Sequence, residues 1–128
     1  MALSRDNGTA SNPVVRQRLA RSYVELEILR LNTLRSLSGY DGPVAPPEAS
    51  ISKLFWASWH QRFCELAIDI LGPAGLVVED FPYQLGEFQR TFLFSRSETV
   101  YGGSNEIQKN IIGERVLGLP PEPKGVTR

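Results

Sequence analysis

The sequence predicts an all-α protein, most simply a four-helix up-and-down bundle. Apolar residues recur about every 3.6 residues in two long segments and two shorter ones, which is the period of an amphipathic helix. Segments rich in Gly and Pro separate these helices, and no segment alternates apolar and polar residues as a half-buried strand does. The apolar run that follows Gly75 contains only two β-branched residues, which is too short to nucleate a sheet.

The first helix is expected to follow a flexible lead-in over residues 1–12, because that segment is polar and rich in Ser, Asn and Gly. Asn12 is a suitable N-cap and Pro13 a suitable first helical residue. The helix should end at Ser38, where Gly39 follows. Its apolar positions are Val15, Leu19, Tyr23, Leu26, Leu29, Thr33 and Leu37.

The second helix is predicted over Glu48–Leu71, after a loop at residues 39–47 that holds too many Pro and Gly for regular structure. This helix is apolar around most of its circumference, so it should contact several neighbours as the central helix or lie in a subunit interface. The run from Gly72 to Gly75 should end it. We expect three of its side chains in the core: Phe55, Leu66 and Ile70.

Two shorter helices complete the predicted bundle. The third spans Tyr83–Ser95, and the fourth spans Ser104–Leu117 with Gly118 as its C-cap. The helical bundle domain therefore covers residues 13–118, and residues 119–128 form a C-terminal tail.

Composition narrows the class of protein. The 128 residues include 14 Lys plus Arg and 14 Asp plus Glu, so the formal net charge is zero. A binder of nucleic acid or of a membrane surface needs clustered surplus Lys or Arg, so neither partner is favoured. One cysteine, Cys64, cannot form an internal disulfide, and we expect a cytoplasmic protein. The start has no apolar segment typical of a signal peptide, and no stretch approaches the ~18 apolar residues of a membrane span.

A pair of glycines precedes the fourth predicted helix, in the run Tyr101-Gly102-Gly103-Ser104. Adjacent glycines before a helix N-terminus leave backbone N–H groups unobstructed by side chains. Such a loop is suited to hold an anion or a carbonyl oxygen, although alone it is more often a simple turn.

The sequence around the glycine pair forms a motif that is longer and more specific than the pair alone. Residues 101–118, YGGSNEIQKNIIGERVLG, resemble the C-terminal signature of the flavin-dependent acyl-CoA dehydrogenases. The resemblance extends back through residues 67–75, AIDILGPAG, and residues 49–55, ASISKLF, and covers 12–123. In that family a helical N-terminal domain and a middle β-domain precede a C-terminal four-helix domain, and this chain resembles the last, without its opening helix.

The family dehydrogenates an acyl-CoA thioester: a carboxylate removes the α-proton while the β-hydride passes to FAD, giving a 2-enoyl-CoA. In many members the base is the glutamate directly after the loop tyrosine, a position that Gly102 occupies here. The resemblance therefore implies no catalytic residue in this chain. It implies substrate binding at Tyr101 and Gly102, with the Gly102 N–H polarising the thioester carbonyl.

The resemblance also implies five cofactor-binding positions: Asp69, Gly72, Gly103, Ser104 and Glu106. The last three match positions near the adenosine diphosphate part of FAD. Asp69 stands where many relatives place a Gln that reaches the flavin of a neighbouring subunit. An ionised Asp69 would repel a phosphate, and Pro73 replaces a glycine and removes an N–H donor, so this second contact departs from the family pattern.

The remaining side chains that could bind a metal or react are expected to have only structural roles. His60 has no second His or Cys at a ligand spacing and is expected to be packed or half-exposed, so no metal site is predicted. Cys64 is expected to be a small core residue. Glu87 and Glu98 are the nearest carboxylates upstream of the loop and are expected on the surface.

Three functions stay open from the sequence. The chain is the C-terminal domain of an FAD-dependent acyl-CoA dehydrogenase, or of a non-catalytic scaffold subunit in a heteromeric dehydrogenase, or it is a helical oligomerisation domain that binds no cofactor. Most of the flavin and acyl pocket belongs to the other domains in the family. We therefore expect this chain alone to retain no FAD and to be inactive toward acyl-CoA. Because the family pairs these helical domains and the second helix is apolar around most of its circumference, we also expect the chain to self-associate.

Overall fold

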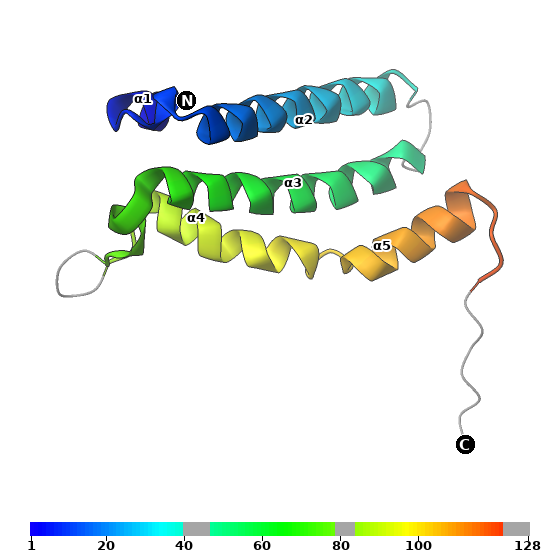
Figure 1. The fold of residues 1–128 in the computed structure, drawn as a ribbon. Helices are drawn as coiled ribbons and strands as arrows, with labels where there is room; N and C mark the ends of the chain where they lie inside the picture. Colours follow the sequence, from blue (N-terminus) through cyan, green and yellow to red (C-terminus); the bar gives the residue numbers. More distant parts are fainter. Residues whose placement is uncertain (40–46, 79–83, 122–128) are drawn as a thin grey trace.

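The computed structural model describes residues 1–39, 47–78 and 84–121 (Figure 1). The regular structure in these ranges is helical, which confirms the all-α class. Four helices in the described ranges have seven residues or more: α2 (Pro13–Ser38), α3 (Pro47–Leu71), α4 (Glu87–Ser95) and α5 (Asn105–Ile111). Three predictions fall wholly or partly outside the description: the loop at 39–47, the helix start at Tyr83 and the tail at 119–128.

The segment expected as a loop before the first long helix contains regular structure. Residues Ala2–Asp6 form a short helix, α1, and a 3-10 turn spans Thr9–Ser11. Ser4 is buried and its hydroxyl donates to the Met1 carbonyl, while the Asn7 amide donates to the Ile70 carbonyl at the end of α3. The Asn7 side chain attaches the segment to α3, so its polar composition does not mean irregular structure here.

Helix α2 has the bounds that its end signals predict. The Asn12 Oδ1 accepts hydrogen bonds from the amides of Val14 and Val15 at 2.9 and 3.4 Å. At the other end the Gly39 amide donates to the Arg35 carbonyl. The cap and the terminal glycine therefore delimit this helix without help from tertiary contacts.

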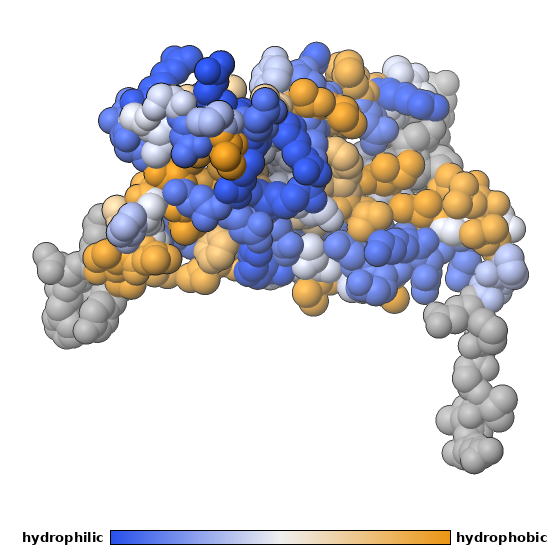
Figure 2. Space-filling view, in the orientation of Figure 1, coloured by the Kyte–Doolittle hydropathy of each residue, from blue (hydrophilic) through white to orange (hydrophobic). Residues whose placement is uncertain are grey.

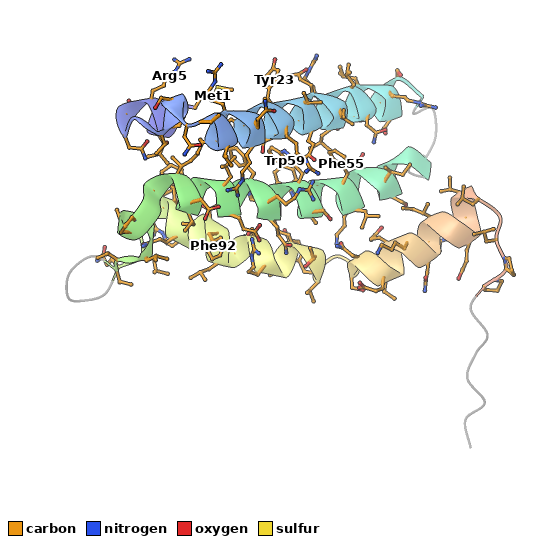
Figure 3. The ribbon with its side chains drawn as sticks, in the orientation of Figure 1. Met1, Arg5, Tyr23, Phe55, Trp59 and Phe92 are labelled. Atoms are coloured by element: carbon orange, nitrogen blue, oxygen red, sulfur yellow. The ribbon has the colours of Figure 1, made fainter. Side chains whose placement is uncertain are left out.

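Helix α3 holds the core of the described residues, as predicted for the second long helix. The buried apolar side chains all belong to it: Ala57, Trp59, Cys64, Leu66 and Ile70. Leu66 and Ile70 are thus confirmed as core residues, whereas Phe55 is only half-buried. Trp59 lies between α3 and α2 (Figure 3), and its indole N–H donates to the Ser22 carbonyl on α2 at 3.0 Å.

Helix α4 begins at Glu87, later than predicted, because Gly86 is extended and ends the connecting segment. The Gly86 amide donates to the Gln89 side-chain oxygen at 2.8 Å. The Gln89 amide in turn donates to the carbonyls of Gly75 and Val77 at 2.9 and 2.7 Å. This side chain therefore fixes the helix start and joins it to the 3-10 turn (Gly72–Leu76) that follows α3 and to the residue after that turn.

The helices form three layers with α3 in the middle (Figure 1). Helix α2 runs antiparallel to α3 on one side. On the other side α4 and α5 follow one another in a single direction, both packed against α3. A 3-10 turn over Arg96–Thr99 and the glycine loop join them, and α5 continues as a wider π-helical turn over Ile112–Val116. The glycine loop thus lies beside the N-terminal half of α3, where Lys53 contacts it.

The outer surface carries much apolar area. Orange patches lie among the hydrophilic ones in Figure 2, and large apolar side chains of α2 are exposed. They are Val14, Tyr23, Val24, Leu26, Ile28, Leu31, Leu34 and Leu37. No helix within the described ranges has both the length and the apolar character needed to cross a bilayer.

Candidate functional site

The glycine loop connects two helices through backbone angles that only glycine adopts readily. Gly102 has φ of 66° and Gly103 has φ of 92°. The loop starts where the Tyr101 amide donates to the Ser97 carbonyl at 2.9 Å. Two consecutive positive φ angles would strain any L side chain, so the sequence needs both glycines for this path.

Side chains from two different helices hold the carbonyls of the loop. The Gln108 Nε2 on α5 donates to the Gly102 carbonyl at 3.0 Å, and the Lys53 Nζ on α3 donates to the Gly103 carbonyl at 2.6 Å. Gln108 is buried, and a Cβ added at Gly103 would lie 2.9 Å from its Nε2. Gly103 is therefore required by packing as well as by its backbone angle.

Three consecutive N–H groups of the loop have no partner among the described residues. Within the described part of the chain, the amides of Gly102, Gly103 and Ser104 make no hydrogen bond. Gly102 is exposed, and Gly103 and Ser104 are partly exposed. These three consecutive donors are free for an acceptor atom outside the chain, as the sequence predicts for a loop of this kind.

The first turn of α5 contains the predicted cofactor residues Ser104 and Glu106. The Ser104 hydroxyl caps the helix by accepting from the Ile107 amide at 3.4 Å. Hydrogen bonds from its own backbone amide and from Ser104, with the charges of Lys109 and Lys53, lower the pKa of the Glu106 carboxyl. Glu106 is thus an exposed, ionised group beside the free amides and is not suited to contact a phosphate directly.

The other two predicted cofactor residues lie elsewhere. Asp69 is on α3 about 24 Å from Lys53, at about 1.5 Å of rise per residue, so it does not join the glycine loop in one chain. Its carboxylate is paired with Arg18 of α2 at 2.7 Å, across a partly exposed surface. Gly72 follows with φ of 62° and ends α3. The positive charge of Arg18 offsets the negative charge of the Asp69 carboxylate.

The two upstream carboxylates differ in exposure. Glu87 is exposed, as expected. Glu98 is 5% exposed, which corrects the prediction of a surface residue. Its carboxylate contacts the His60 Nδ1 at 2.7 Å, and the His60 ring stacks on Trp56 with centroids 4.7 Å apart. Burial is tolerated because the carboxylate has this partner, and the pair joins α3 to the 3-10 turn before the loop.

Three residues around the loop give no local sequence signal: Lys53, Gln61 and Gln108. The Gln61 Nε2 donates to the Ser95 carbonyl at 3.2 Å and to the Thr99 hydroxyl at 3.1 Å. Lys53 lies on the same face of α3 as the buried Ala57 and as His60, at spacings of four and three residues. This spacing is the one pattern that could have indicated that Lys53 faces another helix.

No group of three or more potential metal ligands occurs among the described residues. Cys64 is 4% exposed, and burial raises the pKa of its thiol. It is therefore a neutral core residue at physiological pH.

Comparison with known proteins gives a family for the whole helical region. Residues 2–117 match the family described as acyl-CoA dehydrogenase, C-terminal domain. The chain is 45% identical over 125 residues to acyl-CoA dehydrogenase IpdE1 of Mycobacterium tuberculosis, which covers 96% of this chain and 31% of that protein. It is 46% identical to IpdE1 of Mycolicibacterium smegmatis, covering 96% of the chain and 30% of the relative. The chain thus spans about a third of these relatives.

Solved structures of related proteins share this fold. One is named Tcur3481-Tcur3483 steroid ACAD, with a TM-score of 0.79 and 27% identity over 94% of this chain and 32% of that one. Another is the ChsE4-ChsE5 complex of Mycobacterium tuberculosis, with a TM-score of 0.73 and 31% identity over 88% of this chain and 30% of that one. The family match, the identities and the helical fold agree, and the chain belongs to the acyl-CoA dehydrogenase family, of which it represents the C-terminal domain.

Proposed function

We propose that this chain is the C-terminal part of an FAD-dependent dehydrogenase that forms a 2-enoyl-CoA from an acyl-CoA thioester. The observation that supports this most is the glycine loop, where three consecutive amides have no partner among the described residues while side chains hold the carbonyls of Gly102 and Gly103. Free, preorganised amides are the groups that stabilise negative charge developing on a carbonyl oxygen.

In this proposal the Gly102 amide donates to the thioester carbonyl. As the α-proton leaves, that oxygen gains charge, and a fixed N–H donor lowers the free energy of the enolate. Gly102 offers no carboxylate at the position where many family members carry the base, so this proposal assigns the base to a carboxylate outside this chain. Tyr101 is 53% exposed and would border the acyl group.

The fit to FAD differs between the predicted contacts. Unpaired amides at Gly103 and Ser104 suit the oxygens of a ribose or a pyrophosphate. The carboxylates of Glu106 and Asp69 do not suit a phosphate, although the Arg18 partner of Asp69 reduces the repulsion there. FAD, when bound, supplies the acceptor for the β-hydride.

The test removes the single donor from Gly102 in the longer protein that contains this chain. Proline cannot serve, because Gly102 has φ of 66° and proline requires about −65°. Glycolic acid at position 102 replaces the amide by an ester and keeps the backbone flexible. The matched control is glycolic acid at Gly118, another exposed glycine with φ of 65°.

We expect kcat/KM toward acyl-CoA to fall by about 100- to 1000-fold for the position 102 ester, the cost typical of a lost oxyanion donor. FAD binding should be unchanged, and the position 118 ester should behave as the unmodified protein. Turnover of the position 102 ester at the unmodified rate would rule out this role of the Gly102 amide.

A second candidate is a scaffold subunit that completes the flavin site of a catalytic partner. It is supported by the absence of a carboxylate at Gly102 and by two similar structures whose names give two components. One of those names includes a steroid, so a steroid-derived acyl-CoA is the substrate class to try first. If the longer protein turns over acyl-CoA only after a partner is added, and its own upstream carboxylates can be neutralised without loss, the scaffold function is supported.

A plain oligomerisation domain is the third candidate. It predicts that the longer protein, assembled with any partner, binds no flavin in a fluorescence titration. Saturable FAD binding would exclude it.

A further inference from the structure

We propose that Gln108 and Lys53 are positioning residues that turn the amides of Gly103 and Ser104 toward the cofactor. This inference rests on the proposed function, because the cofactor is part of it. Neither residue is assigned a role by the family resemblance described above. The argument depends on the geometry of two peptide groups in the glycine loop.

In a trans peptide the C=O and the following N–H point in opposite directions, because the group is planar. The Gly102 carbonyl is bonded to the buried Gln108 side chain at 3.0 Å. The amide of the same peptide belongs to Gly103, and it must therefore point away from Gln108. That amide is unpaired within the described residues.

The next peptide is held in the same way from the opposite helix. The Gly103 carbonyl is bonded to the Lys53 ammonium group at 2.6 Å, so the Ser104 amide points away from α3. A charged donor on a carbonyl makes a stronger hydrogen bond than a neutral one. Two adjacent amides thus face away from the residues that hold their carbonyls.

These side chains are needed because glycine does not fix its own peptide planes. Gly102 and Gly103 have no Cβ, so the peptide between them rotates with little steric resistance. Without the two donors, the carbonyls could turn outward, where their partial negative charge would repel a pyrophosphate. With them, the amides of Gly103 and Ser104 stay on the sides of the loop that lie opposite Gln108 and Lys53.

The first measurement uses this chain and needs no flavin. Amide hydrogen exchange and NMR shifts of Gly103 and Ser104 are compared in the wild type, Gln108→Met, Lys53→Met and Lys53→Arg. Lys109→Met is the matched control, because Lys109 is an exposed lysine on the same helix as Gln108. We expect Gln108→Met to alter the Gly103 amide and Lys53→Met to alter the Ser104 amide, with Lys53→Arg and Lys109→Met near the wild type.

The second measurement is FAD affinity in the longer protein. Each Met variant at position 53 or 108 should raise the Kd for FAD by about three- to tenfold, the range of one oriented hydrogen bond. Lys53→Arg should restore the affinity, which loss of packing alone would not explain. The thermal midpoint is followed in parallel, so that a variant that fails to fold is replaced by Lys53→Gln or Gln108→Leu.

The outcomes separate the two proposals. Folded Met variants with unchanged Gly103 and Ser104 amides would overturn the positioning role, whatever the activity of the protein. Equal effects of Lys109→Met would also overturn it. If the amides respond as expected but the longer protein neither binds FAD nor oxidises acyl-CoA, the proposed function fails while the loop geometry is upheld.

Discussion

At the scale of single residues, a glycine can be required for its backbone angle or for the space that its missing side chain leaves, and Gly103 is required for both. Gly103 needs a positive φ, and its missing Cβ leaves room for Gln108 at a distance of 2.9 Å. Gly118 needs a positive φ alone, because no atom of the described residues lies within 4 Å of an added Cβ there. Comparing these two positions therefore separates the backbone requirement from the packing requirement.

We predict that Gly118→Ala lowers the free energy of unfolding by about 1–2 kcal/mol, the cost of a left-handed backbone angle in an L residue. Gly103→Ala should lower it further, because the methyl group displaces the Gln108 amide from the Gly102 carbonyl. Urea unfolding followed by circular dichroism measures both values. Equal losses would show that Gln108 adjusts freely.

Cys64 gives a prediction about pH. Burial raises the pKa of its thiol, so the folded chain opposes thiolate formation. The resulting stabilisation is complete below the pKa of the unfolded thiol, about 9, and is lost as pH rises from there through the raised pKa of the folded thiol. The stability advantage of the wild type over Cys64→Ala should therefore be smaller at pH 10 than at pH 7. Urea midpoints at the two pH values check this, and an unchanged difference would contradict it.

At the scale of elements, α3 contributes the core and also holds the site. Its apolar face packs against α2 and α4, while Lys53, His60 and Gln61 bond to the segments around the glycine loop. Loss of packing in α3 should therefore affect both stability and loop geometry.

Leu66 is the residue on which to test this packing. It is 2% exposed, so Leu66→Ala should lower the free energy of unfolding by about 2–5 kcal/mol through a residual cavity. Leu93→Ala on α4 is the control, because Leu93 is 53% exposed and should cost about 0.5 kcal/mol or less. Similar losses for both variants would contradict the assignment of Leu66 to the core.

The elements also show which features a sequence can predict. The bounds of α2 follow from Asn12, Pro13 and Gly39, all of which act within one turn of the helix. Helix α1 depends on contacts with the end of α3, more than sixty positions away in sequence, so a local reading misses it. The late start of α4 has the same cause, because Gln89 bonds to Gly75 and Val77.

The same distinction applies to the candidate site. The glycine loop and its capping Ser104 are local and were predictable from the sequence and its family resemblance. Lys53 and Glu98 were not, because a lysine or a glutamate on a helix is most often a solvated surface residue. Their partners, the Gly103 carbonyl and His60, are brought to them only by the packing of α3 against the third layer.

At the scale of the whole molecule, the exposed apolar face of α2 predicts self-association. Leu31 and Leu34 are 57% and 50% exposed on a helix with polar neighbours. Covering such side chains in a second copy would remove apolar area from water. Sedimentation velocity at high micromolar concentration should show dimers or larger species, and Leu31→Glu with Leu34→Glu should shift them toward monomer. Lys109→Glu is the surface control, and a monomer under all conditions would contradict the prediction.

The π-helical turn at Ile112–Val116 has a consequence for insertions and deletions. There the Leu117 amide donates to the Ile112 carbonyl at 3.1 Å, five positions back instead of four. Such a turn contains one more residue than an α-helical turn, which is how a helix absorbs a single inserted residue while its upstream face stays in register. Deleting one residue within it would restore ordinary winding and rotate everything after it by about 100°. The Leu119 amide donates to the Gly113 carbonyl at 2.9 Å. After such a deletion Gly118 and Leu119 would leave the helix in another direction. Length in this segment is therefore constrained more tightly than side-chain identity.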